Sequence, residues 1–510
     1  MKRISFALLL LSAVFATACC GSAAGANNPD PGFTEKNSDT APGSSPETEA
    51  LSSAADYSIP EPDLPELDFG EGPFIIFAGK VGQAGILTWL EDLDYENLLF
   101  PASAFLSSEG LTGEVVNDAV YNRNLMVEEK FNLRFQIEKS EIRCDEPILA
   151  GEPIDLVLAS GTVLAETALS GVYENMSSIP YLDLTAEYWS PRCLEGTVVD
   201  SLVFMMPSDI CLDPLVHTGI LFFNKRILSE NDLENPYDMV RQNTWTLENF
   251  LNLVRSVHKD LNGNGTMDVD DLFGGLFRYE WRDGAWMQFY FGAGQTYTRI
   301  DKDLGRALAF NPEIGQGIID RLYEVLEDRR ICMDFEDVEK LGGPELYDQI
   351  FLEGRSLFCQ HFITSTDVFR EMEDDFGIVP NPKYDSDQDR YYQRVDPGSG
   401  MFSIPVTTPS VEKTGAVAEY MSWLSHNTVL PAYYEITIKT KRVRDEDAVE
   451  MLDIIRNSRV FEFGDLYQTR ISHYVWDAYV FRSFPQRVSA NEKLLGKAVA
   501  RYVSRLRSLE

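Results

Sequence analysis

Short apolar stretches alternating with helical stretches constrain the fold of this chain more than any other feature of its sequence. "GPFIIFAGK" is a β-type run, and "FNLRFQIE" alternates apolar and polar residues as a half-buried strand does. A helical pattern runs from Asn117 to Lys130, and "PIDLVLAS" is a buried strand that leads into a helical stretch from Val163 to Leu169. Strand, helix, strand, strand and helix in this order predict an α/β lobe with a mainly parallel sheet.

The same pattern begins again with "GILFFNKRIL", which is a strand followed by the start of a helix. Two well-marked helices follow, one capped by Thr246 and one capped by Asn311 with Pro312 in its first turn. A further helix is expected from about Ser410 to Ser425, and the C-terminal part is largely helical. A chain of 510 residues has room for more than one lobe. The sequence therefore predicts two α/β regions.

The first twenty residues have the pattern of an export signal. Lys2 and Arg3 form a short positive region, and the apolar run that follows, up to Phe15, is too short for an ordinary membrane span. The sequence "ATACC" then resembles the lipobox of bacterial lipoproteins, which implies cleavage before Cys19 and a diacylglyceryl group on its thiol. We expect a protein anchored by lipid to the outer face of the cell membrane. Plain secretion is the alternative.

Residues 20–70 differ in composition from the rest of the chain. They are rich in Gly, Ala, Ser, Pro, Asn and Glu and have almost no large aliphatic residues before Leu64. Such a composition cannot bury enough apolar surface to offset the entropy of ordering the chain. This stretch is predicted to be a disordered acidic tether between the membrane and a globular body.

Charge and cysteine content exclude several classes of protein. The net charge is −37, which argues against nucleic acid as a partner and against direct adsorption to anionic lipid. Apart from Cys19 and Cys20, the cysteines are odd in number and form no CxxC pair, which argues against a disulfide scaffold or a zinc site; they are Cys144, Cys193, Cys211, Cys332 and Cys359. One bridge between Cys193 and Cys211 stays open beside the alternative of buried free thiols.

The stretch "DLNGNGTMDVDD" has the spacing of a calcium-binding loop. Oxygen-bearing residues fall at its first, third, fifth, seventh, ninth and twelfth positions, with Gly265 at the sixth; they are Asp260, Asn262, Asn264, Thr266, Asp268 and Asp271. The sequence has no second loop of this kind, and "LFGGLF" after the loop reads as a strand rather than a helix. We therefore expect a structural calcium site and not a calcium switch. The alternative is a polar turn without metal.

Catalysis finds little support in the sequence. It has no HExxH, no GxSxG and no phosphate-binding glycine-rich loop. Its 81 acidic residues make any pair of carboxylates uninformative. A metal site formed by His217, His361 and His473 is an alternative to separate histidines, but their scattered positions favour the latter. We expect no enzymatic activity.

Five stretches together resemble a known family. "PIDLVLASG", "IPYLDLTAEYWS", "TGILFFNKRIL", "NPYDMVRQNTWTLENF" and "FGIVPNP" are similar, in this order and spacing, to family 1 extracellular solute-binding proteins of ABC transporters. "GEVVNDAVYNRNLMVEEKFNL" resembles a clostridial-type branch of that family. The resemblance covers about residues 72–440 and implies a maltose-binding-protein-like fold. That fold is the class II periplasmic-binding-protein-like α/β fold, whose two lobes are joined by a hinge that the chain crosses three times. Lobe one would comprise residues 72–205 and 383–438, and lobe two residues 206–382 and 439–510.

The resemblance also implies a solute site between the lobes. A sugar needs an aromatic platform and a few polar groups that fix its orientation, and loops that follow sheet strands supply them. The predicted ligand-binding residues are Ser160, Gly161, Thr162, His217, Thr218, Trp281, Asp283, Trp286, His361, Phe362, Tyr474 and Trp476. Core packing is the alternative for each aromatic residue in this set. Trp245 and Trp423 follow amphipathic helix patterns and are predicted to lie in the core.

The expected function is that of a substrate-binding subunit of an ABC importer. It would capture an oligosaccharide in the cleft as a monomer and deliver it to a membrane permease, with calcium as a structural ion. A first alternative keeps the fold but binds a polyamine or a peptide, since Asp283 beside tryptophans could hold an ammonium group. A second alternative is a surface lipoprotein that acts on glycans.

Overall fold

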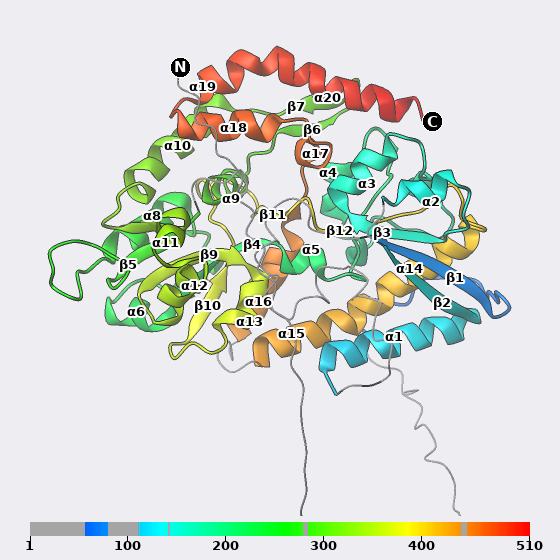
Figure 1. Cartoon of the computed structure of the whole chain (residues 1–510), viewed down its shortest axis with the longest axis horizontal. Coiled ribbons are helices and arrows are strands. Elements are labelled where there is room, and N and C mark those ends of the chain that lie inside the picture. Colours follow the sequence, from blue (N-terminus) through cyan, green and yellow to red (C-terminus); the bar gives the residue numbers. More distant parts are fainter. Residues whose placement is uncertain are drawn as a thin grey trace, which may run out of the picture. The chain divides into compact units, whose positions relative to one another are not determined.

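A computed structural model describes residues 57–79, 111, 113–140, 143–278, 284–439 and 446–509, and Figure 1 shows the order of its elements. Two separate sheets organise these residues. We refer to the parts of the chain packed around the first and second sheets as lobe one and lobe two. Cys19, Trp281 and Asp283 lie outside the described residues, as does most of the predicted tether.

The first sheet is mainly parallel, as the sequence predicts. Its strand order is β12-β3-β1-β2, in which β1 is parallel to β2 and β3 whereas β12 is antiparallel to β3. The strands are β1 (Gly72–Gly79), β2 (Leu133–Ser140), β3 (Leu156–Ser160) and β12 (Gly400–Ser403). Helices cover it on opposite sides (Figure 1); these are α1 (Val115–Phe131) and α14 (Val411–Asn427) on one side and α2 (Asp145–Leu149) and α3 (Gly161–Ala168) on the other.

Alternation along β1 explains why this sheet is buried on both faces. Phe74 and Ile76 share a core with Phe131 of α1, whereas Phe77 belongs to a second core that contains Leu164 of α3. Successive side chains of a strand point to opposite faces. The near-continuous apolar run "FIIFA" is therefore typical of a strand that has helices on both sides.

The second sheet is mixed. Its order is β10-β4-β9-β5-β8, with β9, β5 and β8 parallel and with β4 antiparallel to both of its neighbours. The strands are β4 (Gly219–Asn224), β5 (Phe273–Phe277), β8 (Cys332–Asp334), β9 (Ser356–Phe362) and β10 (Phe376–Val379). The helices of this part are α6 (Lys225–Glu230), α7 (Pro236–Arg241), α8 (Leu247–Ser256), α9 (Ala285–Gly292), α10 (Pro312–Leu326), α11 (Phe335–Gly342), α12 (Glu345–Leu352) and α13 (Thr366–Phe369).

Helix starts agree with the capping residues expected from sequence. The Thr246 hydroxyl accepts a hydrogen bond from the Asn249 N–H at 3.4 Å, and the Asn311 side chain accepts from two N–H groups at the start of α10. Each cap satisfies backbone donors that have no partner within the helix. These local interactions fix the starts of α8 and α10 before any tertiary contact is considered.

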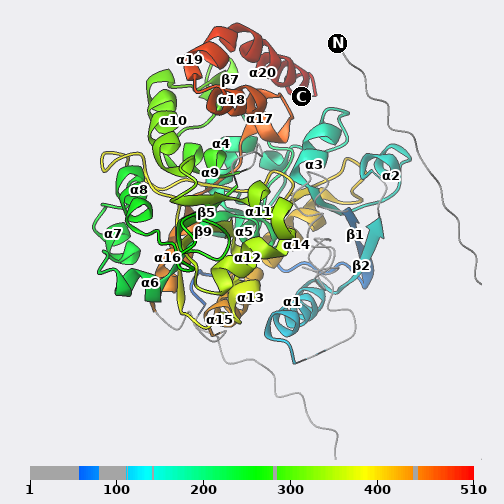
Figure 2. The same cartoon turned by 60° about the vertical axis from the view of Figure 1, so that its left-hand side comes forward.

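Two small sheets and the C-terminal helices form much of the rest of the described chain, together with the short helices α4 (Leu194–Thr197) and α5 (Asp213–Val216). β11 (Gln393–Arg394) pairs in parallel with β13 (Arg459–Val460), and β6 (Thr298–Asp301) forms a hairpin with β7 (Gly305–Leu308). The helices are α15 (Val429–Lys439), α16 (Glu446–Asn457), α17 (Phe463–Leu466), α18 (Ile471–Val480), α19 (Phe484–Arg487) and α20 (Glu492–Arg507). Figures 1 and 2 both show α18, α19 and α20 beside β7.

Packed structure starts inside the stretch predicted to be a tether. The Tyr57 ring packs edge-on against Trp423 at 5.0 Å between centroids, and Trp423 Nε1 donates to the Ile59 carbonyl at 2.8 Å. Leu64 and Phe69 pack against the same core of lobe one. The overall composition of residues 20–70 predicts a tether, although the few apolar residues near its end are spaced so that they can pack against a core.

The sequence predicts that the chain returns from lobe two to lobe one at residue 383. In the structure the chain returns to the first sheet later than that. The Lys383 N–H still donates to the Trp245 carbonyl at 3.1 Å, on the side of the second sheet. The chain joins the first sheet only at Gly400.

The predictions for two tryptophans, for the cysteines and for membrane-spanning helices can be compared with the structure. Trp245 and Trp423 are buried, as predicted. The five cysteines from Cys144 onward are buried and free, so the Cys193–Cys211 bridge does not form in this structure. Among the described residues, no helix has the length and apolar character needed to cross a bilayer.

Gly274 in β5 gives a test of this packing. A Cβ atom at this position would lie 1.9 Å from the Val254 carbonyl oxygen, which belongs to α8. Gly274→Ala should therefore lower the free energy of unfolding in urea by about 1–3 kcal/mol or more, because α8 must move away from the sheet. Gly496→Ala in α20 is the matched control, since its Cβ would meet only Leu308 at 3.8 Å. It should raise stability by about 1 kcal/mol, and equal effects of the two substitutions would contradict the packing described.

Candidate functional site

The two sheets meet where their strands end. β3 ends at Ser160, directly opposite Gly400, and β9 ends at Phe362, opposite Gly219. Connections between the sheets lie against each other here, because the Asp396 N–H donates to the His217 carbonyl at 3.2 Å. We call this region the interlobe junction; it comprises residues 160–162, 213–219, 360–362, 381 and 393–399. In open α/β sheets, ligands bind outside the carboxyl ends of strands.

The predicted residues Ser160, Gly161 and Thr162 lie at the junction. The Ser160 and Thr162 hydroxyl oxygens are 2.9 Å apart. The Gly161 and Thr162 N–H groups donate to the carbonyls of Ser399 and Pro397 at 2.9 and 3.1 Å. A Cβ on Gly161 would lie 2.9 Å from the Pro397 oxygen, so glycine permits this close approach. The start of α3 is thereby attached to the connection that leads into β12.

His217 and Thr218 also lie at the junction, and both are buried. His217 Nδ1 is 2.8 Å from an Asp213 carboxylate oxygen, and the His217 ring meets Phe362 edge-on at 6.0 Å. Burial on its own would lower the pKa of His217, but the nearby carboxylates of Asp213 and Asp396 outweigh it and raise that pKa above its usual value. The structure thus brings His217 and Phe362 together with a charged partner.

Buried amide side chains form the part of the junction that sequence reasoning missed. Asn381 Nδ2 donates to the Gly219 carbonyl and to Gln393 Oε1, both at 2.9 Å, and lies 3.4 Å from Gln288 Oε1. Gln360 Nε2, Gln393 Nε2 and Asn381 Oδ1 are buried without a hydrogen-bond partner among the described residues. Such unpaired buried groups are costly and call for an explanation. An amide that follows an apolar strand, as in "FCQHF" or "IVPNP", is the only sequence feature that points to them.

Trp286, Tyr474 and Trp476 lie outside the junction, whereas His361 belongs to it at the end of β9. The Trp286 side chain is buried and stacks on Tyr479 at 5.1 Å, with its Nε1 donating to the Val475 carbonyl. Tyr474 and Trp476 belong to α18 and pack partly buried against the core. His361 Nδ1 contacts the Ser365 hydroxyl, and its Nε2 is 3.5 Å from Asp348. In this structure Trp286 presents no face to a ligand.

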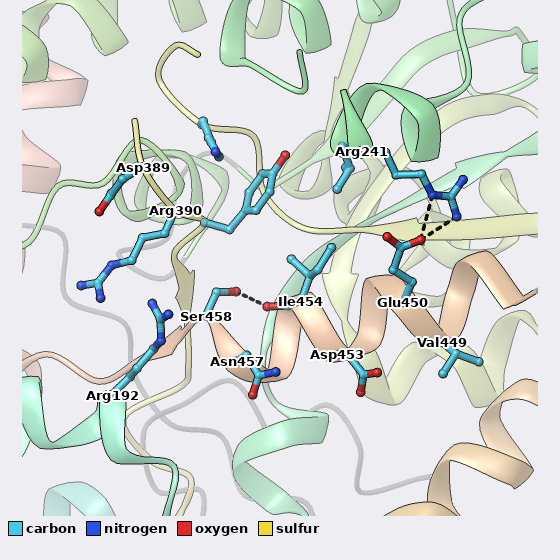
Figure 3. A pocket seen from close by; sticks show the side chains of 13 residues that line it. Arg192, Arg241, Asp389, Arg390, Val449, Glu450, Asp453, Ile454, Asn457 and Ser458 are labelled. Carbon is cyan, nitrogen blue, oxygen red and sulfur yellow. Dashed lines mark hydrogen bonds and ion pairs between the residues drawn. The ribbon is translucent and has the colours of Figure 1, made fainter. Parts of the chain in front are cut away.

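A cavity of about 720 Å³ lies outside the set of residues predicted from sequence. Its walls come from α7, α16, the loop that contains Lys383 and Tyr391, and Arg192 of a short 3-10 helix (Pro191–Cys193) in lobe one (Figure 3). The volume is in the range of small-molecule pockets. No single sequence motif marks it, because its walls are brought together only by the fold.

The predicted calcium loop has the expected types of oxygen donor, but its carboxylates accept hydrogen bonds from the backbone of the loop and do not point toward one common centre. Asp260 accepts from the N–H groups of Gly263 and Gly265, at 2.6 and 2.8 Å, and Asp271 accepts from Leu261 and Asp268. The loop is closed by paired backbone hydrogen bonds between Lys259 and Leu272, each 3.0 Å long. Within the described residues, no three His, Cys, Asp or Glu side chains gather in a way that could hold a metal. The oxygen donors suit Ca²⁺ in kind, and binding would require them to converge.

Comparison with known proteins identifies the fold. No family model and no curated protein matches the chain. A sugar transporter from Rhizobium etli, solved in an open conformation, is 11% identical with a TM-score of 0.50 and is aligned over 74% of this chain and 95% of its own. A family 1 extracellular solute-binding protein from Bifidobacterium longum subsp. infantis is 13% identical (TM-score 0.48; 85% and 99% covered). A maltose/maltodextrin-binding domain from Bdellovibrio bacteriovorus bound to maltotriose is 14% identical (TM-score 0.44; 86% and 99% covered). The likeness to the Rhizobium protein, together with the two sheets, confirms the predicted two-lobed periplasmic-binding-protein-like fold.

The ion pair of His217 predicts a dependence of stability on pH. Because its pKa is raised in the folded state, the pair should stabilise fully below the ordinary histidine pKa of about 6.5 and lose its effect as pH rises through the folded pKa. His217→Gln should therefore lower the free energy of unfolding more at about pH 5.5 than at about pH 9. Urea unfolding measures both, and His258→Gln, at an exposed position, is the control. An equal loss at both pH values would show that the charge of His217 does not matter.

Proposed function

We propose that the protein is the substrate-binding subunit of an ABC importer and that it captures an oligosaccharide at the interlobe junction. The observation that carries this proposal is the set of buried amides at the converging strand ends. Within the part of the chain that the structure describes, Gln360 and Gln393 each have a buried N–H₂ group without a hydrogen-bond partner, and Asn381 has a buried oxygen without one. Neutral amides both donate and accept, which is what sugar hydroxyls require. The Rhizobium protein of the same fold is itself a sugar transporter.

The sequence supports export and anchoring. Its positive start, short apolar run and Cys19 have the pattern of a lipoprotein signal, and the residues before Tyr57 have the composition of a tether. In this proposal the protein stays on the outer face of the membrane and passes its solute as a monomer to permease subunits. It carries out no reaction on the solute.

Gln360 provides a test of where the solute binds. Purified protein should show a saturable change in tryptophan fluorescence and in Tm with one class of oligosaccharide, with no product formed. Gln360→Met keeps the size of the side chain but removes its amide, so we expect binding to weaken by about fivefold or more. Gln136→Met, on the exposed edge of β2, is the control and should bind as the wild type does.

The alternatives give different results in the same experiment. Saturation by a polyamine or a peptide, without any response to sugars, would keep the binding role but replace the solute. Conversion of a glycan into product would establish an enzyme. Binding of a sugar with equal affinity in both glutamine variants would place the solute away from the junction.

We also propose that the loop Asp260–Asp271 binds calcium as a structural ion of lobe two. Its order of oxygen donors and the short backbone pairing that closes it support this assignment. Asp260 and Asp268 would contribute carboxylate oxygens, and bound calcium would join the two ends of the loop. Nothing in this role requires a change in lobe arrangement.

Calcium should raise the Tm of the wild-type protein, because an ion that binds only the folded state stabilises it. Asp260→Asn should remove most of this increase. Asp270→Asn, which changes an exposed residue of the same loop at a position without a ligand role, should keep it. The measurement is a thermal scan in calcium and in a chelator. A Tm that is insensitive to calcium in the wild type, or an equal response in both variants, would rule out the site.

A further inference from the structure

We propose that the 720 Å³ cavity beside α16 is a second ligand site, which takes an organic molecule bearing an oxyanion such as a carboxylate or a phosphate ester. The cavity shares no residue with the interlobe junction as defined above, so this inference does not depend on the proposed function.

Lys383 brings a buried positive charge to the cavity wall. Lys383 is only 6% exposed. Its Nζ donates to Asn243 Oδ1 at 2.7 Å and to the Gln388 carbonyl at 3.0 Å. Nζ also lies 4.8 Å from the centre of the Tyr391 ring. Burial lowers the pKa of Lys383, although Asp389 acts in the opposite direction. An ammonium group has three donors, and the hydrogen bonds described use two of them, both on neutral oxygens.

Two further buried donors on this wall have no partner among the described residues. They are the Tyr391 hydroxyl and the Arg390 Nε. The terminal nitrogen of Arg390 is engaged, since it donates to both carboxylate oxygens of Glu195, at 2.9 and 3.1 Å. A buried donor that lacks a partner costs about 1–3 kcal/mol. A ligand that supplies acceptor oxygens would remove this cost.

Arg192 adds a free guanidinium group at the same end of the cavity. Its side chain is exposed and makes no hydrogen bond or ion pair with any residue that the structure describes. Figure 3 shows Arg192 and Arg390 at one end, while Arg241 and Glu450 lie at the other end, paired with each other at 2.7 Å. The positive charge that remains available is therefore concentrated near Arg192.

The carboxylates of the lining do not reverse this preference. Asp389 and Asp453 also line the cavity, but both are exposed residues whose oxygens water can solvate. The groups that are buried and unpaired on this wall are all donors. Val240 and Ile454 give the cavity apolar walls, which suit the body of a sugar-sized molecule. The structure therefore favours a ligand with one oxyanion and an apolar or ring-shaped remainder.

Three probes distinguish the sources of the oxyanion. Glucuronate carries a carboxylate, glucose 6-phosphate carries a phosphate ester, and glucose is the neutral molecule of the same ring. Calorimetric titration of the purified full-length protein should show saturable binding of at least one acidic probe and much weaker binding of glucose. Tyr391→Phe removes only the unpaired hydroxyl, and we expect about a fivefold loss of affinity for the acidic probe.

Arg192→Ala should weaken binding of the acidic probe by about threefold or more, because the substitution removes an unpaired cation from the rim of the cavity. Arg501→Ala is the matched control, since Arg501 is an exposed arginine of α20 that does not line the cavity. Neither Tyr391→Phe nor Arg192→Ala should change binding of a neutral oligosaccharide at the junction. Lack of binding by both acidic probes, equal binding of glucose, or unchanged affinity in both cavity variants would overturn the proposal.

Discussion

A buried ion pair between Arg456 and Asp209, with the half-exposed Glu187 beside it, links the C-terminal helices to one segment of lobe one, and the rest of the structure depends on it. Arg456 donates to Asp209 at 2.6 Å and to Glu187 at 2.9 Å, and His426 is 2.8 Å from Asp209. Burial on its own would raise the pKa of Asp209, but Arg456 and His426 outweigh it and keep the pKa below its usual value. Removing one partner of a buried pair typically costs about 3–5 kcal/mol. The carboxylate of Asp209 can be buried only while Arg456 stays in place.

The contacts continue along residues 187–209 and form a seam. Further arginine contacts join this segment to β7, β13, α20 and the loop after β10; they are Arg459 with Ser190, Arg390 with Glu195, Arg306 with the Val198 carbonyl and Arg507 with Asp200. A ligand can shift a conformational equilibrium only by the difference between its affinities for the two states. Opening the lobes along this seam would break several charged hydrogen bonds at once. The lobe motion required by the proposed function is therefore expected to keep the contacts of the seam intact. We expect the lobes to separate at the junction instead.

The fold could be predicted from the sequence because its signals are local and repeated. Thr246 and Asn311 cap the helices that they were expected to cap, and the apolar runs before Gly79 and Ser160 become buried strands. The site could not be predicted in the same way. Whether a polar residue such as Gln360 faces the junction depends on sheet register and on partners far along the chain. Trp286 shows the opposite error, because this aromatic residue was predicted to contact a ligand but its side chain is fully buried in the core.

One short segment links the cavity, the seam and the junction. From Lys383 to Gln393 the chain carries two cavity donors, Lys383 and Tyr391, one seam arginine, Arg390, and one junction amide, Gln393. Arg390 belongs to both the cavity and the seam, since it lines the cavity while it binds Glu195 across the lobes. A ligand that moves Arg390 in the cavity would also disturb its contact with Glu195 in the seam. Coupling between two binding sites is reciprocal. If the solute at the junction and the ligand in the cavity favour the same arrangement of this segment, each ligand therefore increases the affinity of the protein for the other.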